Sequence, residues 1–125
     1  MGKEVGYSIR FDDFTDPNGL TQIKYVTDGI LVRECLIDPD LKDYQVVILD
    51  EAHERSLNTD ILFALVKQAV LRRKGSLRLV VTSATLKTDQ IARYYFGKPT
   101  LLGDNSSGCP VLSVSGRCYP VSILH

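Results

Sequence analysis

The stretch from Val46 to Arg55, with the sequence Val-Val-Ile-Leu-Asp-Glu-Ala-His-Glu-Arg, decides the fold. It is an apolar run, rich in β-branched residues, that leads directly into two adjacent carboxylates, Asp50 and Glu51. Such a run is typical of a strand that is buried on both faces of a parallel sheet. Open α/β sheets bind ligands beyond the carboxyl ends of their strands, so we expect both carboxylates to lie in a binding crevice.

The two carboxylates have the chemistry of a Walker B motif. Asp50 offers a hard oxygen ligand, which suits a Mg²⁺ ion that keeps several waters and takes further ligands from ATP phosphates. Glu51 can orient or deprotonate an attacking water, and His53 can couple the γ-phosphate state to the rest of the protein. An acidic pair after an apolar strand can also simply cap the next helix, so this pair alone does not decide the function.

A second predicted strand, at residues 77–82, ends in Ser83-Ala84-Thr85. The hydroxyls of Ser83 and Thr85 can hydrogen-bond the carboxylates of the first strand and report the loss of a phosphate. In isolation such hydroxyls often do no more than satisfy strand ends and turns. The combination of Asp-Glu-Ala-His-Glu-Arg with a later Ser-Ala-Thr is far more specific than either motif alone.

Alternating strand and helix patterns predict an α/β fold with a mostly parallel sheet and flanking helices. The expected strands are residues 7–11, 23–27, 45–49, 77–82 and 111–114, and the expected helices are residues 28–36, 57–73 and 89–96. Asp28 is expected to cap the first helix, which would bury Ile30, Leu31 and Leu36. Residues 12–19 and 103–108 are expected to form loops.

The start of the first predicted helix, Thr27-Asp28-Gly29, is a candidate nucleic-acid contact. The Thr27 hydroxyl and free backbone N–H groups at a helix start can hold a phosphate, and Arg33 can add a charged contact. A purely structural interpretation is the alternative, in which Thr27 and Asp28 are ordinary capping residues and Arg33 is a solvated side chain. Spacing alone favours this structural interpretation.

Composition restricts the class of protein. Fifteen basic and fifteen acidic residues cancel, which argues against a charge-driven RNA-binding module but not against a motor with few, local phosphate contacts. Three cysteines without a CxxC pair indicate neither a zinc site nor a disulfide framework, and a reduced intracellular compartment fits best. No apolar run reaches membrane-spanning length, so we expect a soluble protein without a membrane partner.

Beyond these motifs, the chain resembles the DEAH-box RNA helicases of superfamily 2 over nearly its whole length. The segments that carry the resemblance, in family order, are residues 6–11, 27–29, 33–34, 50–55, 83–85 and 116–121. The amino-acid sequence of residues 33–41 is most similar to that of the pre-mRNA-splicing members. The resemblance implies that residues 1–125 form a partial helicase ATP-binding domain, the second half of the first RecA-like domain.

The resemblance also implies a role for each candidate residue. Mg²⁺ would bind Asp50 and Glu51, and ATP or another NTP would be bound through Asp50, Glu51, His53 and Arg55. Glu51 would activate water, while His53, Ser83 and Thr85 would complete the catalytic group that links hydrolysis to unwinding. The sugar–phosphate backbone of RNA would contact Thr27 and Arg33 without regard to base sequence. Spliceosomal or other ribonucleoprotein partners and a nuclear location follow from the likeness to splicing members.

The sequence also departs from the family. It contains no GxxxxGK[ST] phosphate loop, and the second RecA-like domain is absent. We therefore expect part of an ATP-dependent RNA helicase, which hydrolyses NTP to translocate on or remodel RNA, and a chain that is inactive alone. One alternative is a naturally short, non-catalytic RNA- or protein-binding module. Another is a truncated product that never folds.

Overall fold

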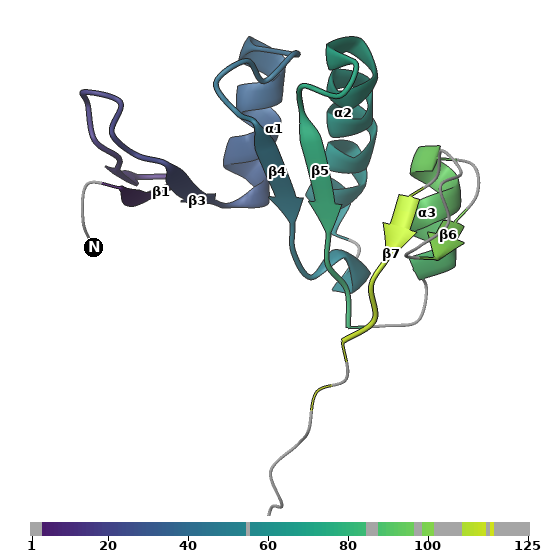
Figure 1. The fold of residues 1–125 in the computed structure, drawn as a ribbon. Coiled ribbons are helices and arrows are strands. Elements are labelled where there is room, and N and C mark those ends of the chain that lie inside the picture. The colour runs from purple at the N-terminus through teal and green to yellow at the C-terminus, as the bar shows by residue number, and fades with distance from the viewer. Residues whose placement is uncertain are drawn as a thin grey trace, which may run out of the picture. The chain divides into compact units, whose positions relative to one another are not determined.

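The computed structural model describes residues 4–54, 56–84, 88–96, 99–101, 109–114 and 116 (Figure 1). The chain divides into two compact units, Met1–Ala84 and Thr85–His125. The first unit contains β1 (Val5–Ile9), β2 (Asp12–Phe14), β3 (Ile23–Val26), α1 (Asp28–Ile37), β4 (Val46–Leu49), the 3₁₀ helix η1 (Ala52–Glu54), α2 (Leu57–Arg73) and β5 (Arg78–Val81). The second unit contains α3 (Thr88–Phe96), β6 (Pro99–Leu101) and β7 (Cys109–Val111).

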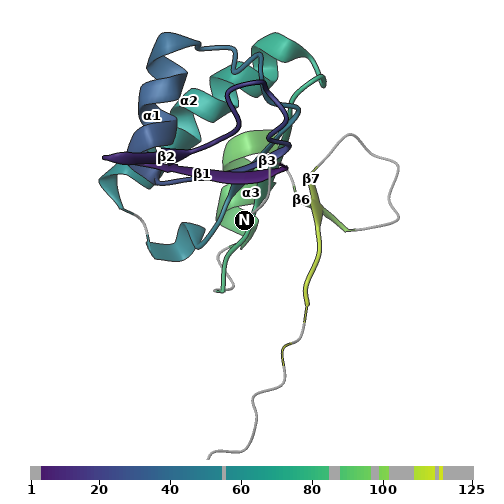
Figure 2. The same ribbon diagram turned by 90° about the vertical axis from the view of Figure 1, so that its left-hand side faces the viewer.

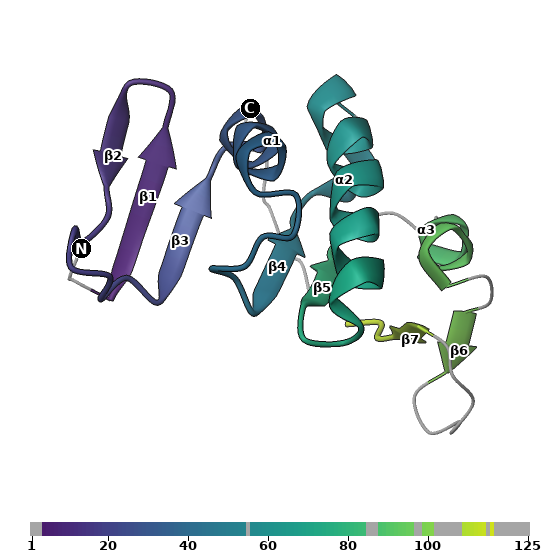
Figure 3. The same cartoon turned by 90° about the horizontal axis from the view of Figure 1, so that it is seen from above.

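Parallel pairing dominates the described strands. β1 pairs in parallel with β3, β4 with β5, and β6 with β7. The one antiparallel pair joins β1 to β2, so that the three-stranded sheet has the order β2-β1-β3 (Figure 3). The prediction of an α/β fold with mostly parallel strands is therefore confirmed for the described residues.

The strand β2 lies in a segment that the sequence predicted to be a loop. Its residues pair with β1 in the register Tyr7↔Phe14, and the two rings stack with centroids 5.9 Å apart. The hydroxyl of Tyr7 donates to Oδ2 of Asp12 at 2.7 Å. Gly6 lies against the backbone oxygen of Phe14, where a Cβ atom would have no room. The loop prediction was wrong for residues 12–14 because these tertiary contacts override the weak strand propensity of aspartate.

The helices α1 and α2 lie side by side and cover the same face of the β4–β5 pair (Figures 1 and 2). Burial therefore alternates along β4: Val47 and Leu49 are 5% and 4% exposed, whereas Val46 and Ile48 are 46% and 61% exposed. The prediction of a strand buried on both faces was wrong. Within the first unit, α1 and α2 lie on one face of the pair, and the alternate apolar side chains of β4 remain in contact with solvent.

The helix α2 has the predicted bounds, residues 57–73. Its buried face carries Leu62, Val66 and Ala69, which are spaced as an amphipathic helix requires. At the start, the Ser56 hydroxyl accepts a hydrogen bond from the Thr59 N–H at 3.0 Å, which satisfies one of the free donors of the first turn. At the end, Lys74 and Gly75 both adopt positive φ angles, of 46° and 93°, which stop the helix.

Helix α1 differs from its prediction in two respects. Thr27 is the N-cap residue, with no side-chain capping hydrogen bond, and Asp28 is the first helical residue rather than the cap. Leu31 is buried, as predicted, and Cys35, which was not predicted to be buried, is buried too. Leu36 was predicted to be buried but is 69% exposed. Leu31 and Cys35 are four residues apart and share one face, whereas Leu36 is rotated by about 100° from Cys35.

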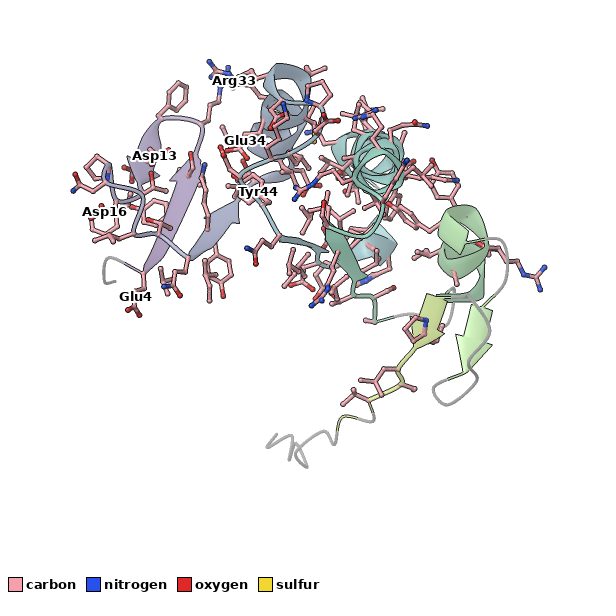
Figure 4. The ribbon with its side chains drawn as sticks, turned by 45° about the horizontal axis from the view of Figure 1, so that its top comes forward. Glu4, Asp13, Asp16, Arg33, Glu34 and Tyr44 are labelled. Atoms are coloured by element: carbon pink, nitrogen blue, oxygen red, sulfur yellow. The ribbon has the colours of Figure 1, made fainter. Side chains whose placement is uncertain are left out.

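A carboxylate on α1 connects three segments of the first unit. Glu34 accepts hydrogen bonds from Lys24 Nζ of β3 and from the Tyr44 hydroxyl, which precedes β4, each at 2.6 Å. Figure 4 shows Glu34 and Tyr44 next to each other. Burial and the hydrogen bond to Glu34 raise the pKa of the Tyr44 phenol. These contacts hold α1 in a defined position between β3 and β4.

The basic C-terminal end of α2 makes hydrogen bonds with the segment that connects α1 to β4. Arg73 Nη1 donates to the backbone oxygens of Leu41 and Tyr44, each at 2.6 Å, and Arg72 Nε donates to Oδ1 of Asp40 at 2.7 Å. These arginines therefore serve the end of a helix, as the sequence indicated, and their contacts are with protein oxygens.

In the second unit, α3 packs against β6 and β7. Ala92 and Tyr95 are buried, and the rings of Tyr94 and Tyr95 meet edge to face with centroids 5.2 Å apart. The last strand lies at Cys109–Val111, so the prediction of 111–114 was shifted, and the predicted loop at residues 103–108 lies outside the described residues. Within the part of the chain that the structure describes, no helix is long and apolar enough to cross a membrane.

Candidate functional site

The carboxyl ends of β4 and β5 form the centre of the candidate site. The parallel register pairs Leu49 with Val81, so that the next residues along the two strands, Asp50 and Thr82, are neighbours. The Thr82 N–H donates to the Leu49 oxygen at 2.9 Å, which continues the ladder by one bond. The Thr82 hydroxyl donates to Oδ1 of Asp50. The carboxylate of Asp50 is therefore oriented by the neighbouring strand.

The turn that follows Asp50 is held in an unusual backbone conformation. Glu51 has a φ angle of 52°, in the left-handed region, which costs roughly 1–2 kcal/mol for a residue with a Cβ atom. Two backbone donors fix this turn: Glu51 N–H to Oδ1 of Asp50 at 3.0 Å, and Ala52 N–H to the Thr82 oxygen at 3.0 Å. Ala52 is fully buried, whereas the Glu51 side chain is exposed at the strand end.

His53, in η1, connects the two strand ends through one ring nitrogen. Its Nδ1 lies 3.3 Å from the backbone nitrogen of Ala84 and 3.2 Å from Oε2 of Glu51. Nδ1 accepts from Ala84 when it carries a lone pair and pairs with Glu51 when it carries a proton. The protonation state of His53 Nδ1 thus determines whether this atom bonds to the loop after β5 or to the carboxylate after β4.

The structure brings Asp50, Glu51 and His53 together, as the sequence predicted. Ser83 lies between Thr82 and Ala84 and is therefore at the same edge, half-buried. Thr85 and Arg55, the other two candidates for this site, lie outside the described residues. The geometry is thus defined for the first strand end and for the beginning of Ser-Ala-Thr.

The donor set fits a magnesium ion that arrives with its own ligands. Among the described residues, the hydrogen bonds to the Asp50 carboxylate both go to Oδ1. No group of three or more histidine, cysteine, aspartate or glutamate side chains in the described parts of the chain could form a metal cage. Magnesium does not need one, since in nucleotide sites it is held by one or two carboxylates together with water and phosphate oxygens.

The two candidate RNA contacts lie at different places on α1. Thr27 is exposed and occupies the N-cap position, but its side chain makes no capping hydrogen bond. Arg33 is exposed too, but it lies six residues on, about 9 Å along the helix axis and on a different face. The structure does not bring these two side chains together.

Two features of the site were not predicted from the sequence. Thr82 was assigned to the strand alone, although the register of two parallel strands would have placed it beside Asp50. The Ala84 N–H, as the partner of His53, has no side-chain signal at all. A third contact, between Asp28 at the start of α1 and Ser56 and Thr59 at the start of α2, joins residues 28 to 31 positions apart and is equally hidden.

Comparison with known proteins places these observations in a family context. The chain is 50% identical over 120 residues to the pre-mRNA-splicing factor ATP-dependent RNA helicase prp22 of Schizosaccharomyces pombe, a match that covers 96% of this chain and 9% of that protein. It is 48% identical over 125 residues to the probable ATP-dependent RNA helicase DHX35 of Homo sapiens, with 100% of this chain and 17% of that protein covered. No protein-family model matches the chain.

A solved structure agrees with the sequence relatives. The crystal structure of the Escherichia coli DEAH/RHA helicase HrpB is similar with a TM-score of 0.66 and 38% sequence identity, over 74% of this chain and 12% of that one. The mixed, mostly parallel α/β fold is thus similar to part of a DEAH/RHA helicase structure, and the chain spans less than a fifth of the length of the relatives it matches. Over nearly its whole length, this chain is a homologue of a segment of the DEAH-box helicases.

Proposed function

We propose that this chain is part of an ATP-dependent RNA helicase and forms the second half of its first RecA-like domain. The observation that carries the proposal is the pairing of Asp50 with Thr82 across the ends of two parallel strands, with Glu51 and His53 on the adjoining turn. This arrangement lies where α/β folds bind ligands. The similarity to ATP-dependent RNA helicases along nearly the whole chain supports the same function.

Each residue of the site has a distinct task in this proposal. Asp50, oriented by Thr82, binds the Mg²⁺ that accompanies ATP or another NTP, and Glu51 lies beside it as a second carboxylate. Magnesium supplies charge neutralisation at the phosphates. Glu51 orients the attacking water and accepts its proton, since its side chain extends into solvent from a turn fixed at both ends. His53, with Arg55, belongs to the nucleotide-binding group.

Hydrolysis is coupled to movement through the loop after β5. His53 Nδ1 lies close to both Glu51 and the Ala84 N–H, so a change at the Glu51 carboxylate alters the contact of His53 with the Ser-Ala-Thr segment. We assign to Ser83 and Thr85 the transmission of this change to the rest of the motor. The 125 residues contain no phosphate loop, and ATP hydrolysis therefore requires residues beyond them.

RNA is the proposed substrate, bound through its sugar–phosphate backbone. Thr27 offers an exposed hydroxyl at the start of α1, and Arg33 adds a positive charge farther along. Contacts of this type position a nucleic acid without reading its bases. The similarity to a pre-mRNA-splicing factor favours spliceosomal partners and a nuclear location for the protein.

The test has two parts. The first is the size of the natural polypeptide, determined by immunoblot with an antibody against this segment; a single band far above 13.9 kDa is expected. The second is Mg²⁺-dependent ATP hydrolysis by that polypeptide, with and without single-stranded RNA. A band near 13.9 kDa, together with tight RNA or protein binding that does not depend on nucleotide, would favour the non-catalytic binding module instead.

A further inference from the structure

The starts of α1 and α2 are joined by a compact polar cluster. Oδ2 of Asp28, the first residue of α1, accepts a hydrogen bond from the Thr59 hydroxyl at 2.7 Å and lies 3.3 Å from the Ser56 hydroxyl. The two hydroxyls are themselves 2.6 Å apart, and Ser56 accepts from the Thr59 N–H. We call Asp28, Ser56 and Thr59 the helix-start cluster.

The cluster lies between two segments with different proposed tasks. On one side, Asp28 directly follows Thr27, the proposed RNA contact. On the other, Ser56 is the N-cap residue of α2 and follows the segment that carries Asp50, Glu51 and His53. Both helices start at the same end of the β4–β5 layer (Figure 1). Among the described residues, a hydrogen-bonded link between the two segments therefore runs through Asp28.

The cluster is built to resist displacement. Thr59 is only 6% exposed, so separation from Asp28 would leave its buried hydroxyl without the charged acceptor. The helix starts are also near one another, because a Cβ atom on Gly29 would lie at an ordinary van der Waals distance, 3.8 Å, from Nδ2 of Asn58. A carboxylate here is favourable for both helices, whose N-terminal ends carry partial positive charge. A shift of one helix start is thus transmitted to the other.

We propose that Asp28 is a positioning residue that couples RNA binding at the start of α1 to the nucleotide site, through Ser56 and Thr59. This inference rests on the proposed helicase function and adds to it the route by which the two sites communicate. Coupling between two ligands is reciprocal: if RNA changes the affinity for nucleotide by some factor, nucleotide changes the affinity for RNA by the same factor. Loss of the Asp28 link brings that factor closer to one.

The experiment uses the natural polypeptide that carries this segment. The dissociation constant of a fluorescent single-stranded RNA is measured with and without a non-hydrolysable ATP analogue, and the ratio of the two is the coupling factor. Basal and RNA-stimulated ATPase rates are measured on the same preparations. The variants are Asp28→Ala and Thr59→Val, which remove the acceptor and the donor of one bond, and Thr59→Ser, which keeps the hydroxyl.

Asp40→Ala is the matched structural control. Asp40 also joins the α1 region to α2, through its 2.7 Å contact with Arg72, but at the opposite end of α2 from the helix starts. Its loss removes a polar contact between α2 and the segment that follows α1, without touching the helix-start cluster. A general loosening of the packing between α1 and α2 would therefore appear in this variant too.

We expect Asp28→Ala and Thr59→Val each to reduce the coupling factor and the RNA stimulation of the ATPase by about tenfold, with basal ATPase unchanged. The double variant should lose no more than either single one, since both remove the same link. Thr59→Ser and Asp40→Ala should behave as wild type. Wild-type coupling in Asp28→Ala, or an equal loss in Asp40→Ala, would overturn the inference while the helicase function stands. A wild-type polypeptide without RNA-stimulated ATPase would overturn both.

Discussion

The hydroxyl of Thr82 donates to the carboxylate of Asp50 across the ends of β5 and β4. This contact follows from the parallel register, which pairs Leu49 with Val81 and leaves the next residue of each strand side by side. It orients the proposed magnesium ligand from a strand that carries no ligand of its own. Groups that orient a metal ligand in this way commonly affect metal affinity or activity by 10–100-fold, as an order of magnitude.

Thr82→Val should therefore lower the apparent affinity for Mg²⁺ in ATP hydrolysis by about tenfold, because Asp50 loses the donor that orients it. The measurement is the ATPase rate of the natural polypeptide as a function of Mg²⁺ concentration at saturating ATP. Thr82→Ser keeps the hydroxyl and serves as the control. Equal behaviour of the valine and serine variants would show that the hydroxyl has no part in binding the ion.

Glu34 should be essential for the placement of α1. Replacement of Glu34 by alanine removes the acceptor of the hydrogen bonds from Lys24 and Tyr44. Hydrogen bonds to a charged group contribute on the order of 1.5–3 kcal/mol, and solvent screening reduces this value at a partly exposed site. We therefore expect amide exchange in α1 to become about tenfold faster. Hydrogen–deuterium exchange, resolved by peptide, measures the effect. Lys42→Ala, an exposed change near the same loop, should leave α1 unaltered. Unchanged exchange in the Glu34 variant would refute this role.

Because of Tyr44, we expect the free energy of unfolding to fall at high pH. Its pKa is raised in the folded chain, by burial and by the Glu34 carboxylate, above the ordinary value of 10.0. The neutral phenol is therefore favoured by folding. Its contribution is fully present below pH 10 and declines as the pH rises above 10 towards the folded-state pKa. Thermal unfolding of wild type and Tyr44→Phe, followed from pH 8 to 11, should show a smaller decline in the variant above pH 10. Parallel curves would contradict the assignment.

The isolated 125-residue chain should self-associate. In the part of the chain that the structure describes, β5 pairs only with β4, and Val46, Ile48 and Val80 of this pair are exposed. An unpaired apolar strand edge beside an exposed apolar face favours association. We expect sedimentation velocity to show concentration-dependent oligomers, which Val80→Lys reduces and Leu71→Lys, an exposed change on α2, does not. A sharp, reversible and concentration-independent thermal transition would defeat this prediction.

The sequence predicted those features that depend on local patterns. Helix α2 was predicted residue for residue, because its apolar spacing and its terminal residues are all local signals. The strand β4 and the two carboxylates after it were predicted for the same reason. What could not be predicted depends on tertiary contacts: the pairing of Asp12–Phe14 with β1, the exposure of Ile48, and the contacts of Thr82 and Asp28 with residues about 30 positions away. The roles of all the candidate site residues stay predictions, and Arg55 and Thr85 also lie outside the described residues.

The most direct test of the central claim compares wild type with Glu51→Gln in the natural polypeptide that carries this segment. Glutamine keeps the size of the side chain but cannot accept the proton of the attacking water. We expect ATP hydrolysis with Mg²⁺ and RNA to fall by about 10²–10⁴-fold, while the affinity for ATP, measured by equilibrium binding, changes little. Hydrolysis at the wild-type rate in the Glu51→Gln protein, or no hydrolysis by wild type, would contradict it.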